Sequence, residues 1–227
     1  MGGQLIFDLP IRAALNRHDF IVAPCNGEAV ALIDDWQSQS ACLHWLYGPS
    51  GCGKSHLAAV LAHNQAAACV PSADIAQHGA VKACLAEHAS CPDILIIDAL
   101  DELRPRDEEV LFHLLNAVRH SPHKRRLLLT SIGAPAHLDL RLPDLRSRLL
   151  AIPAIAMHTP DDDLLGYLLF KLFSDRQIIV DEKVVAYLVP RVTREYKAMA
   201  LLVEQIDKHA LTHKRKVTIP LIAEVLD

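Results

Sequence analysis

The stretch Gly48-Pro49-Ser50-Gly51-Cys52-Gly53-Lys54-Ser55 decides the fold of this chain. It fits the phosphate-binding loop pattern, which is a glycine, four residues and then Gly-Lys-Ser. The apolar segment Leu43 to Tyr47 before it predicts a buried strand, and the Ala- and Leu-rich segment Ser55 to Gln65 after it predicts a helix. The order strand, loop, helix favours a phosphate loop over a chance glycine-rich turn. A hydrolase nucleophile at Ser50 is disfavoured, because the second glycine of a nucleophile elbow is missing.

The residue types in this loop suit a phosphate chain. Its glycines let backbone N–H groups turn inward, and the positive end of the following helix dipole adds to the attraction. Lys54 is expected to reach the terminal phosphates, and Ser55 to ligate Mg²⁺. The predicted loop residues that bind ADP or ATP are Gly48, Pro49, Ser50, Gly51, Cys52, Gly53, Lys54, Ser55 and His56.

A second signal follows at Pro92-Asp93-Ile94-Leu95-Ile96-Ile97-Asp98, an apolar strand that ends in a carboxylate. An Asp at the C-terminal end of a strand next to a phosphate loop is a typical second holder of Mg²⁺. We therefore expect Asp98 to share the metal with Ser55. A strand that merely ends in a polar turn is the alternative.

Further strands are predicted at Ala68–Pro71 and Arg126–Ser131, with helices at 74–87 and Glu108–Arg119 between them. This alternation indicates an α/β fold with a parallel sheet between helices. From Thr159 onward only helical patterns follow, which predicts a small all-α lid of four helices. The expected organisation is a tail over residues 1–12, a nucleotide-binding domain over 13–158 and a lid over 159–227.

Composition narrows the function classes. The 227 residues are 51% hydrophobic, which argues for a folded chain, and the net charge of −4 gives no broad footprint for nucleic acid. No apolar run is long enough to span a membrane and no signal peptide is evident, so we expect a cytoplasmic protein. The six cysteines form no CxxC pair and are expected to be reduced, with no disulfide and no zinc. The basic cluster Lys124-Arg125-Arg126 is expected to be a solvated end of an element, and His209 and His213 are expected to be surface residues.

The first residues, Gln4-Leu5-Ile6-Phe7-Asp8-Leu9-Pro10, allow two interpretations. By pattern alone, the alternation of Leu5, Phe7 and Leu9 favours an edge strand. A family resemblance favours a binding peptide instead.

The phosphate loop, the Asp-ended strand, an arginine-bearing short helix and the helical lid together resemble an AAA+ module. The segment from Phe20 to Asn26 resembles the start of the AAA+ module of the bacterial replication initiator DnaA, and Leu142-Pro143-Asp144-Leu145-Arg146-Ser147-Arg148-Leu149 resembles its arginine-finger segment. The Gln-Leu-x-Phe-x-Leu tail and the segment Lys216 to Pro220 resemble the Hda family of DnaA-related regulatory inactivators. The resemblance covers essentially the whole chain.

The resemblance implies specific roles. The tail residues Gln4, Leu5, Phe7 and Leu9 would bind the DNA polymerase sliding clamp. Arg148 would act in trans as the arginine finger that stimulates hydrolysis of ATP bound to DnaA, with Arg146 as a second candidate. Phe20, Ile21 and Val22 would form the adenine pocket, and Lys197 would be the lid cation near the phosphates. No direct sequence-specific DNA binding is expected, since no helix-turn-helix follows the lid.

The chain departs from the family pattern at three positions. The residue after Asp98 is Ala99, which cannot accept a proton from water; Ile132 stands where a sensor Asp is usual; and Lys197 replaces an arginine. We expect the bound nucleotide to be hydrolysed slowly if at all and to act as a structural switch. The alternatives are an independent AAA+ ATPase or loader, a nucleotide-dependent scaffold and, least favoured, a small-molecule kinase. Self-association is left open.

Overall fold

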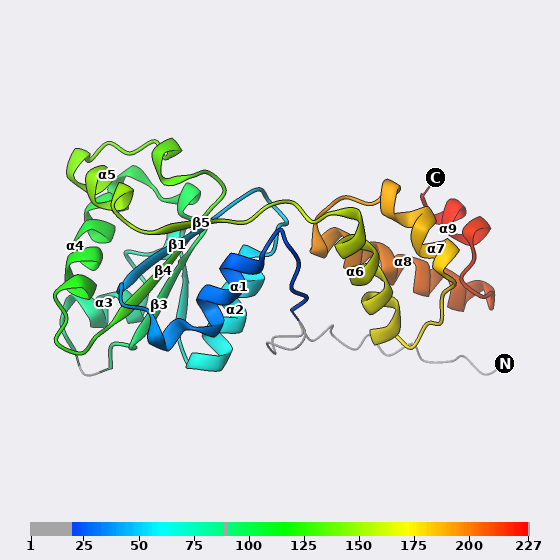
Figure 1. The fold of residues 1–227 in the computed structure, drawn as a ribbon, viewed down its shortest axis with the longest axis horizontal. Helices are drawn as coiled ribbons and strands as arrows, with labels where there is room; N and C mark the ends of the chain where they lie inside the picture. The colour runs from blue at the N-terminus through cyan, green and yellow to red at the C-terminus, as the bar shows by residue number, and fades with distance from the viewer. Residues whose placement is uncertain (1–19, 89, 227) are drawn as a thin grey trace.

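The computed structural model describes residues 20–88 and 90–226, which form an α/β domain followed by a helical lid (Figure 1). The α/β domain is built on a parallel five-stranded sheet in the order β2-β3-β4-β1-β5. Its strands are β1 (Leu43–Tyr47), β2 (Ala68–Pro71), β3 (Ile94–Asp98), β4 (Arg126–Ser131) and β5 (Ala154–Ala156). The predicted fold class is confirmed.

Helices cover both faces of the sheet. One face packs against α1 (Gly27–Asp34), which leads into the short η2 (Trp36–Ser38), and α2 (Lys54–Gln65); the other packs against α3 (Gly79–Leu85), α4 (Glu108–Arg119) and α5 (Pro143–Leu150). The central strands are buried on both sides, as their continuous apolar runs require. Trp45, Leu127 and Leu129 point into the α3–α4–α5 side, and their neighbours Leu46 and Leu128 point into the α1–α2 side.

β5 carries the chain out of the sheet toward the lid. Its residues pair in parallel with β1, from Trp45 and Ala154 to Tyr47 and Ala156. One residue later the Met157 backbone N–H donates to the Tyr47 carbonyl at 2.7 Å. The strand that ends in the phosphate loop is therefore bonded directly to the segment that leads into the lid.

The lid consists of α6 (Asp162–Asp175), α7 (Glu182–Leu188), the short η7 (Val189–Arg191), α8 (Tyr196–His213) and α9 (Ile219–Leu226). Asp161 caps α6 by accepting from the Leu164 N–H at 2.8 Å, and Asp181 caps α7 by accepting from Lys183 at 3.0 Å. These helices enclose their own apolar core, which runs from Leu165 to Ile222. No helix in the described part of the chain is long and apolar enough to cross a membrane.

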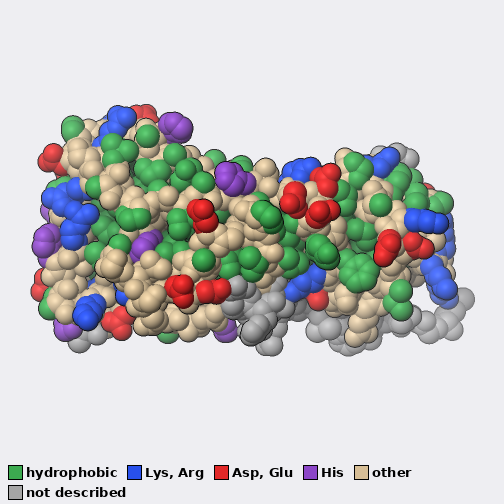
Figure 2. Space-filling view, in the orientation of Figure 1, with side chains coloured by type: hydrophobic (Ala, Val, Ile, Leu, Met, Phe, Trp, Pro, Cys, Tyr) green, Lys and Arg blue, Asp and Glu red, His purple; other side chains and the backbone are tan. Residues whose placement is uncertain are grey.

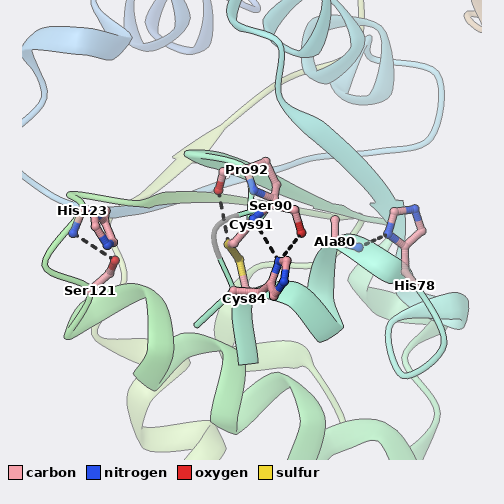
Figure 3. The surroundings of a disulfide bond; sticks show 9 residues. His78, Ala80, Cys84, Ser90, Cys91, Pro92, Ser121 and His123 are labelled. Carbon is pink, nitrogen blue, oxygen red and sulfur yellow. Dashed lines mark hydrogen bonds between the residues drawn. A yellow bond between two sulfur atoms is a disulfide. The ribbon is translucent and has the colours of Figure 1, made fainter. Parts of the chain in front are cut away.

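The structure corrects the prediction that all cysteines are reduced. Cys84 and Cys91 form a disulfide in the turn between α3 and β3 (Figure 3). The turn brings them together because the His88 N–H bonds back to the Ala83 carbonyl at 2.8 Å and the Cys91 N–H bonds to the His88 carbonyl at 3.0 Å. Nothing in the spacing of the two cysteines signals this turn.

Two further expectations need correction. The helix expected over 74–87 is shorter: it is α3, Gly79–Leu85, and it begins after His78, whose side chain caps it by accepting from the Ala80 N–H. The basic cluster before β4 is not a solvated end: Arg125 is buried, and the Arg126 guanidinium donates to the Trp36 and Gln37 carbonyls. β5 was not expected from the sequence.

Candidate nucleotide-binding site

The phosphate loop joins β1 to α2, and its glycines are required by close contacts. A Cβ on Gly48 would lie 2.1 Å from the Met157 carbonyl oxygen, on the segment that leads to the lid. Gly51 has φ +77, and a Cβ there would lie 2.5 Å from Cγ of Glu195 in the lid. The loop is therefore in contact with both the interdomain segment and the lid.

Lys54 begins α2 and is buried. Its Nζ donates to the Gly48 carbonyl at 2.7 Å and to the Pro49 carbonyl at 2.9 Å. The ammonium group thus lies inside the curl of the loop. Its third donor contact is a weak one, 3.7 Å to Sγ of Cys52.

Ser55 and Asp98 meet across the C-terminal edge of the sheet. Ser55 Oγ donates to Asp98 Oδ1 at 3.2 Å, and the Thr130 hydroxyl donates to the same carboxylate oxygen. Thr130 Oγ also accepts the Ala99 N–H at 3.0 Å. A serine hydroxyl and a carboxylate at this separation are a donor set suited to Mg²⁺. Thr130 was not predicted to be part of the site.

Ala99, the residue after Asp98, has no side chain that could act as a general base. Ala99 has φ 55, and the chain then turns into a short 3₁₀ helix, Leu100–Glu102. Asp101 in that helix is already engaged, because its two carboxylate oxygens accept the N–H groups of Ile132 and Gly133 at 2.5 and 3.3 Å. Asp101 therefore ties the turn after β3 to the turn after β4.

Beside the contact with Glu195, a crevice lies between the phosphate loop and helices α6 and α8 of the lid. Phe20, His56 and Tyr196 line it with successive ring contacts of 5.4 and 5.9 Å between centroids. Leu164 and Leu168 of α6 supply an apolar wall. Aromatic and apolar walls beside a phosphate loop suit a flat heterocyclic base.

Only one of the other residues expected around the base and phosphates lines the crevice. This residue is Ile21, whereas Val22 and Lys197 are exposed and are not among the lining residues. Asn26 was missed by the sequence analysis: it is buried, accepts the Ala23 N–H and donates to the Ile21 carbonyl, which shapes this wall.

Arg194, a lid residue that does not line the crevice, was also not predicted. Its guanidinium group donates to the Pro160 carbonyl and pairs with the Asp162 carboxylate at 2.6 Å. Its backbone carbonyl oxygen lies beside Gly51, where an added Cβ would be only 2.9 Å away. Arg194 therefore connects the start of α6 to the lid segment that contacts the loop.

The two arginines of α5 lie in different settings. Arg148 is half-buried: it donates to Asn116 Oδ1 at 2.5 Å, and its guanidinium carbon lies 4.7 Å from the centroid of the Phe112 ring. Arg146 is exposed, and its side chain has no hydrogen bond or ion pair with the described residues. The tail residues Gln4, Leu5, Phe7 and Leu9 lie outside the described part of the chain.

Family models match both domains. The model of the ATPase family associated with various cellular activities (AAA) matches residues 44–153, and the model "Hda, lid domain" matches residues 167–226. The chain is an AAA+ protein related to Hda and DnaA. The expected relationship is thereby confirmed.

Solved AAA+ structures share the fold. Domain III of the Thermotoga maritima replication initiation protein DnaA matches with a TM-score of 0.79 at 18% identity, covering 96% of this chain and 98% of that one. DnaA bound to AMPPCP and single-stranded DNA matches with a TM-score of 0.71 at 17% identity, covering 96% and 81%. RuvB from Thermotoga maritima matches with a TM-score of 0.73 at 16% identity, covering 94% and 72%. At identities of 16 to 18%, these similarities show only that the chain shares the fold of those structures.

Proposed function

We propose that this chain is a nucleotide-binding regulator of replication initiation. It binds ADP or ATP with Mg²⁺, docks on the DNA polymerase sliding clamp through Gln4, Leu5, Phe7 and Leu9, and stimulates hydrolysis of the ATP that is bound to DnaA. The observation that carries the proposal is the lid: an Hda-type lid follows a core that folds like DnaA domain III.

The nucleotide is held by groups with defined tasks. Lys54, already inside the curl of the loop, exchanges carbonyl contacts for phosphate oxygens, and Ser55 and Asp98 hold Mg²⁺. The base packs against the rings of Phe20, His56 and Tyr196, which have to move apart to admit it because the crevice has a volume of only ≈ 50 Å³. The proposed cofactor role is supported by the AMPPCP-bound DnaA structures that share the fold.

The chain's own hydrolysis is slow in this proposal. General-base catalysis needs an acceptor within reach of the attacking water. Ala99 offers none, and hydrogen bonds from the Ile132 and Gly133 N–H groups hold the Asp101 carboxylate against the turn after β4. The nucleotide then serves to set the lid against Gly51 through Arg194 and Glu195.

An arginine of α5 supplies the activity toward DnaA. A guanidinium brought to the γ-phosphate stabilises the charge that spreads over it in the transition state, worth on the order of 10³ to 10⁵ in rate. Arg148 has to leave Asn116 and Phe112 to reach a partner, whereas Arg146 is already exposed. The sequence resemblance favours Arg148 and the exposure favours Arg146.

The test measures hydrolysis of DnaA-bound ATP in the presence of clamp loaded on DNA. The variants are Arg148→Ala and Arg146→Ala, with Arg191→Ala on the lid surface as a matched control. The finger is the arginine whose loss reduces stimulation by about a hundredfold or more while clamp binding by calorimetry is kept. If stimulation is unchanged in both variants, the protein acts as a scaffold. If this chain alone hydrolyses ATP without the clamp, it is an independent ATPase. Loss of clamp binding in Gln4→Ala/Leu5→Ala tests the tail separately.

A further inference from the structure

Helix α6 has a second apolar stripe that faces away from the lid core. Tyr167 and Phe170 are 68% and 52% exposed, although both are large aromatic residues in the middle of a well-formed helix. The opposite side of α6 already supplies Leu165, Leu169 and Phe173 to the core. Tyr167 and Phe170 are therefore not needed to attach α6 to the lid.

The outer stripe is one wall of a groove. Glu182, Val185 and Ala186 of α7, with Val189 just after it, form the facing wall, and the groove has a volume of ≈ 590 Å³. Single exposed apolar residues are ordinary on protein surfaces, whereas exposed aromatic residues beside a groove are typical of binding surfaces. This groove does not share a lining residue with the nucleotide crevice.

Gly166 lies in this groove, in the interior of α6. Glycine is a poorer helix former than alanine at such a position. A Cβ on Gly166 would make only ordinary contacts, 3.8 Å to Cγ1 of Val185 and 3.9 Å to Cγ2 of Val189. Packing inside the lid therefore does not require glycine, and its absent side chain instead leaves the groove open to close approach from outside.

The rim of the groove is acidic. Asp162, Asp163 and Glu182 line it, and no Lys or Arg of the described chain does. Asp162 is paired with Arg194, whereas Asp163 and Glu182 have no ion-pair partner among the residues that the structure describes. Figure 2 shows acidic side chains gathered with apolar ones on this part of the lid. The described residues contain no group of three side chains suited to a metal ion, so a cation site does not explain the carboxylates.

We propose that the α6–α7 groove is a docking site for an amphipathic helix of a partner protein. The apolar side chains of that helix pack between Phe170, Tyr167 and Val185 over Gly166, and its Lys or Arg residues pair with Asp163 and Glu182. An apolar face flanked by positive charge is the partner that complements this lining. The proposal goes beyond the nucleotide-dependent function and does not rest on it.

The experiment uses the full chain and a labelled synthetic helical peptide that carries Leu residues one turn apart with Lys and Arg beside them. Fluorescence anisotropy is measured for the wild type, for Gly166→Leu, which fills the groove, and for Asp163→Lys/Glu182→Lys, which reverses the rim. Asp175→Lys, at the exposed end of α6 and outside the groove, is the matched charge control. Leu is a better helix former than Gly, so Gly166→Leu is expected to keep α6 folded, which circular dichroism checks.

The expected result is binding to the wild type and to Asp175→Lys, with affinity about tenfold or more lower in Gly166→Leu and in the charge-reversed variant. A peptide with Glu in place of Lys and Arg is expected not to bind. Absence of wild-type binding, or equal binding to Gly166→Leu, overturns the proposal. If the peptide does not bind but sedimentation shows self-association that Gly166→Leu removes, the occupant is a second copy of the chain and the partner-helix proposal is wrong.

Discussion

The Thr130 hydroxyl on β4 donates a hydrogen bond to the Asp98 carboxylate on β3, and the same Thr130 oxygen accepts the Ala99 N–H at 3.0 Å. Thr130 therefore fixes both the orientation of Asp98 and the turn that follows it. A substitution that removes only the hydroxyl separates these effects from packing.

In Thr130→Val, we expect Mg²⁺-dependent ATP binding to weaken about tenfold, because Asp98 loses an oriented donor worth roughly 1 to 1.5 kcal/mol. Calorimetry with and without Mg²⁺ measures the change. Thr212→Val on α8, where the hydroxyl bonds only to the Lys208 carbonyl of its own helix, is the control and is expected to have no effect. Equal loss with and without Mg²⁺ would argue against a role for Thr130 through Asp98.

Glu108 positions the arginine-bearing helix. Its carboxylate is buried and accepts the Arg141 N–H at 3.0 Å and the Leu142 N–H at 2.8 Å, just before α5. Glu108→Gln puts an amide N–H against a backbone N–H, so we expect a loss of roughly 2 kcal/mol in the free energy of unfolding. Urea unfolding followed by tryptophan fluorescence reports on this domain, since Trp36 and Trp45, the two tryptophans of the chain, both lie in it. Exposed Glu109→Gln is expected to be neutral, and a similar loss there would contradict the assignment.

The Cys84–Cys91 disulfide closes a turn between residues separated by seven positions. A loop of that length is expected to contribute about 2 kcal/mol of stability. Reducing agent should therefore lower the urea midpoint of the wild type and leave that of Cys91→Ala unchanged. Cys69→Ala, which removes an exposed free thiol, should respond to reductant as the wild type does.

A thiol count checks the disulfide independently. The chain has six cysteines, and Cys25, Cys42, Cys52 and Cys69 are free. Labelling of the denatured, unreduced protein is expected to modify four thiols. Modification of all six would show that the bond is not formed in the purified protein.

Burial lowers the pKa of His44 below its ordinary 6.5. The unfolded chain therefore binds a proton at His44 more readily than the folded chain does. The contribution of His44 to the free energy of unfolding is fully present above pH 6.5 and is lost as the pH falls below that value. In His44→Gln we expect a shallower decline over the same window, measured by urea unfolding at a series of pH values. Parallel curves for the two proteins would rule out this contribution. The exposed variant His63→Gln serves as the control.

Local sequence pattern predicted most of the α/β domain. The strands Leu43–Tyr47, Ala68–Pro71 and Arg126–Ser131 and the helix Glu108–Arg119 have the bounds expected for them, because each is an apolar run or an apolar stripe between polar breaks. β5 was missed because it is only three residues long and is set by its pairing to β1. The disulfide was missed because a turn, and not a spacing motif, creates it.

The site was predictable to the extent that it is local. The loop, Lys54, Ser55 and Asp98 follow from motif and strand ends, and the structure brings Ser55 and Asp98 within hydrogen-bonding distance. The contributions of Thr130, Asn26 and Arg194 depend on contacts between distant segments, which no single-sequence pattern contains. The tail residues lie outside the described part of the chain, and their role stays a prediction.

The sheet order has a consequence for how the chain folds. Strand β1 pairs with β4, so that Trp45 and Ser131, which are bonded at 2.7 Å, are 86 residues apart in sequence. The lid core is assembled from one continuous stretch, from Leu165 to Ile222. Because closing long loops slows folding, the lid is expected to collapse first and the sheet to form later around β1 and β4. On refolding, the full chain would then complete its phosphate loop only after β1 has paired with β4 and β5, and nucleotide binding would report a late step of folding.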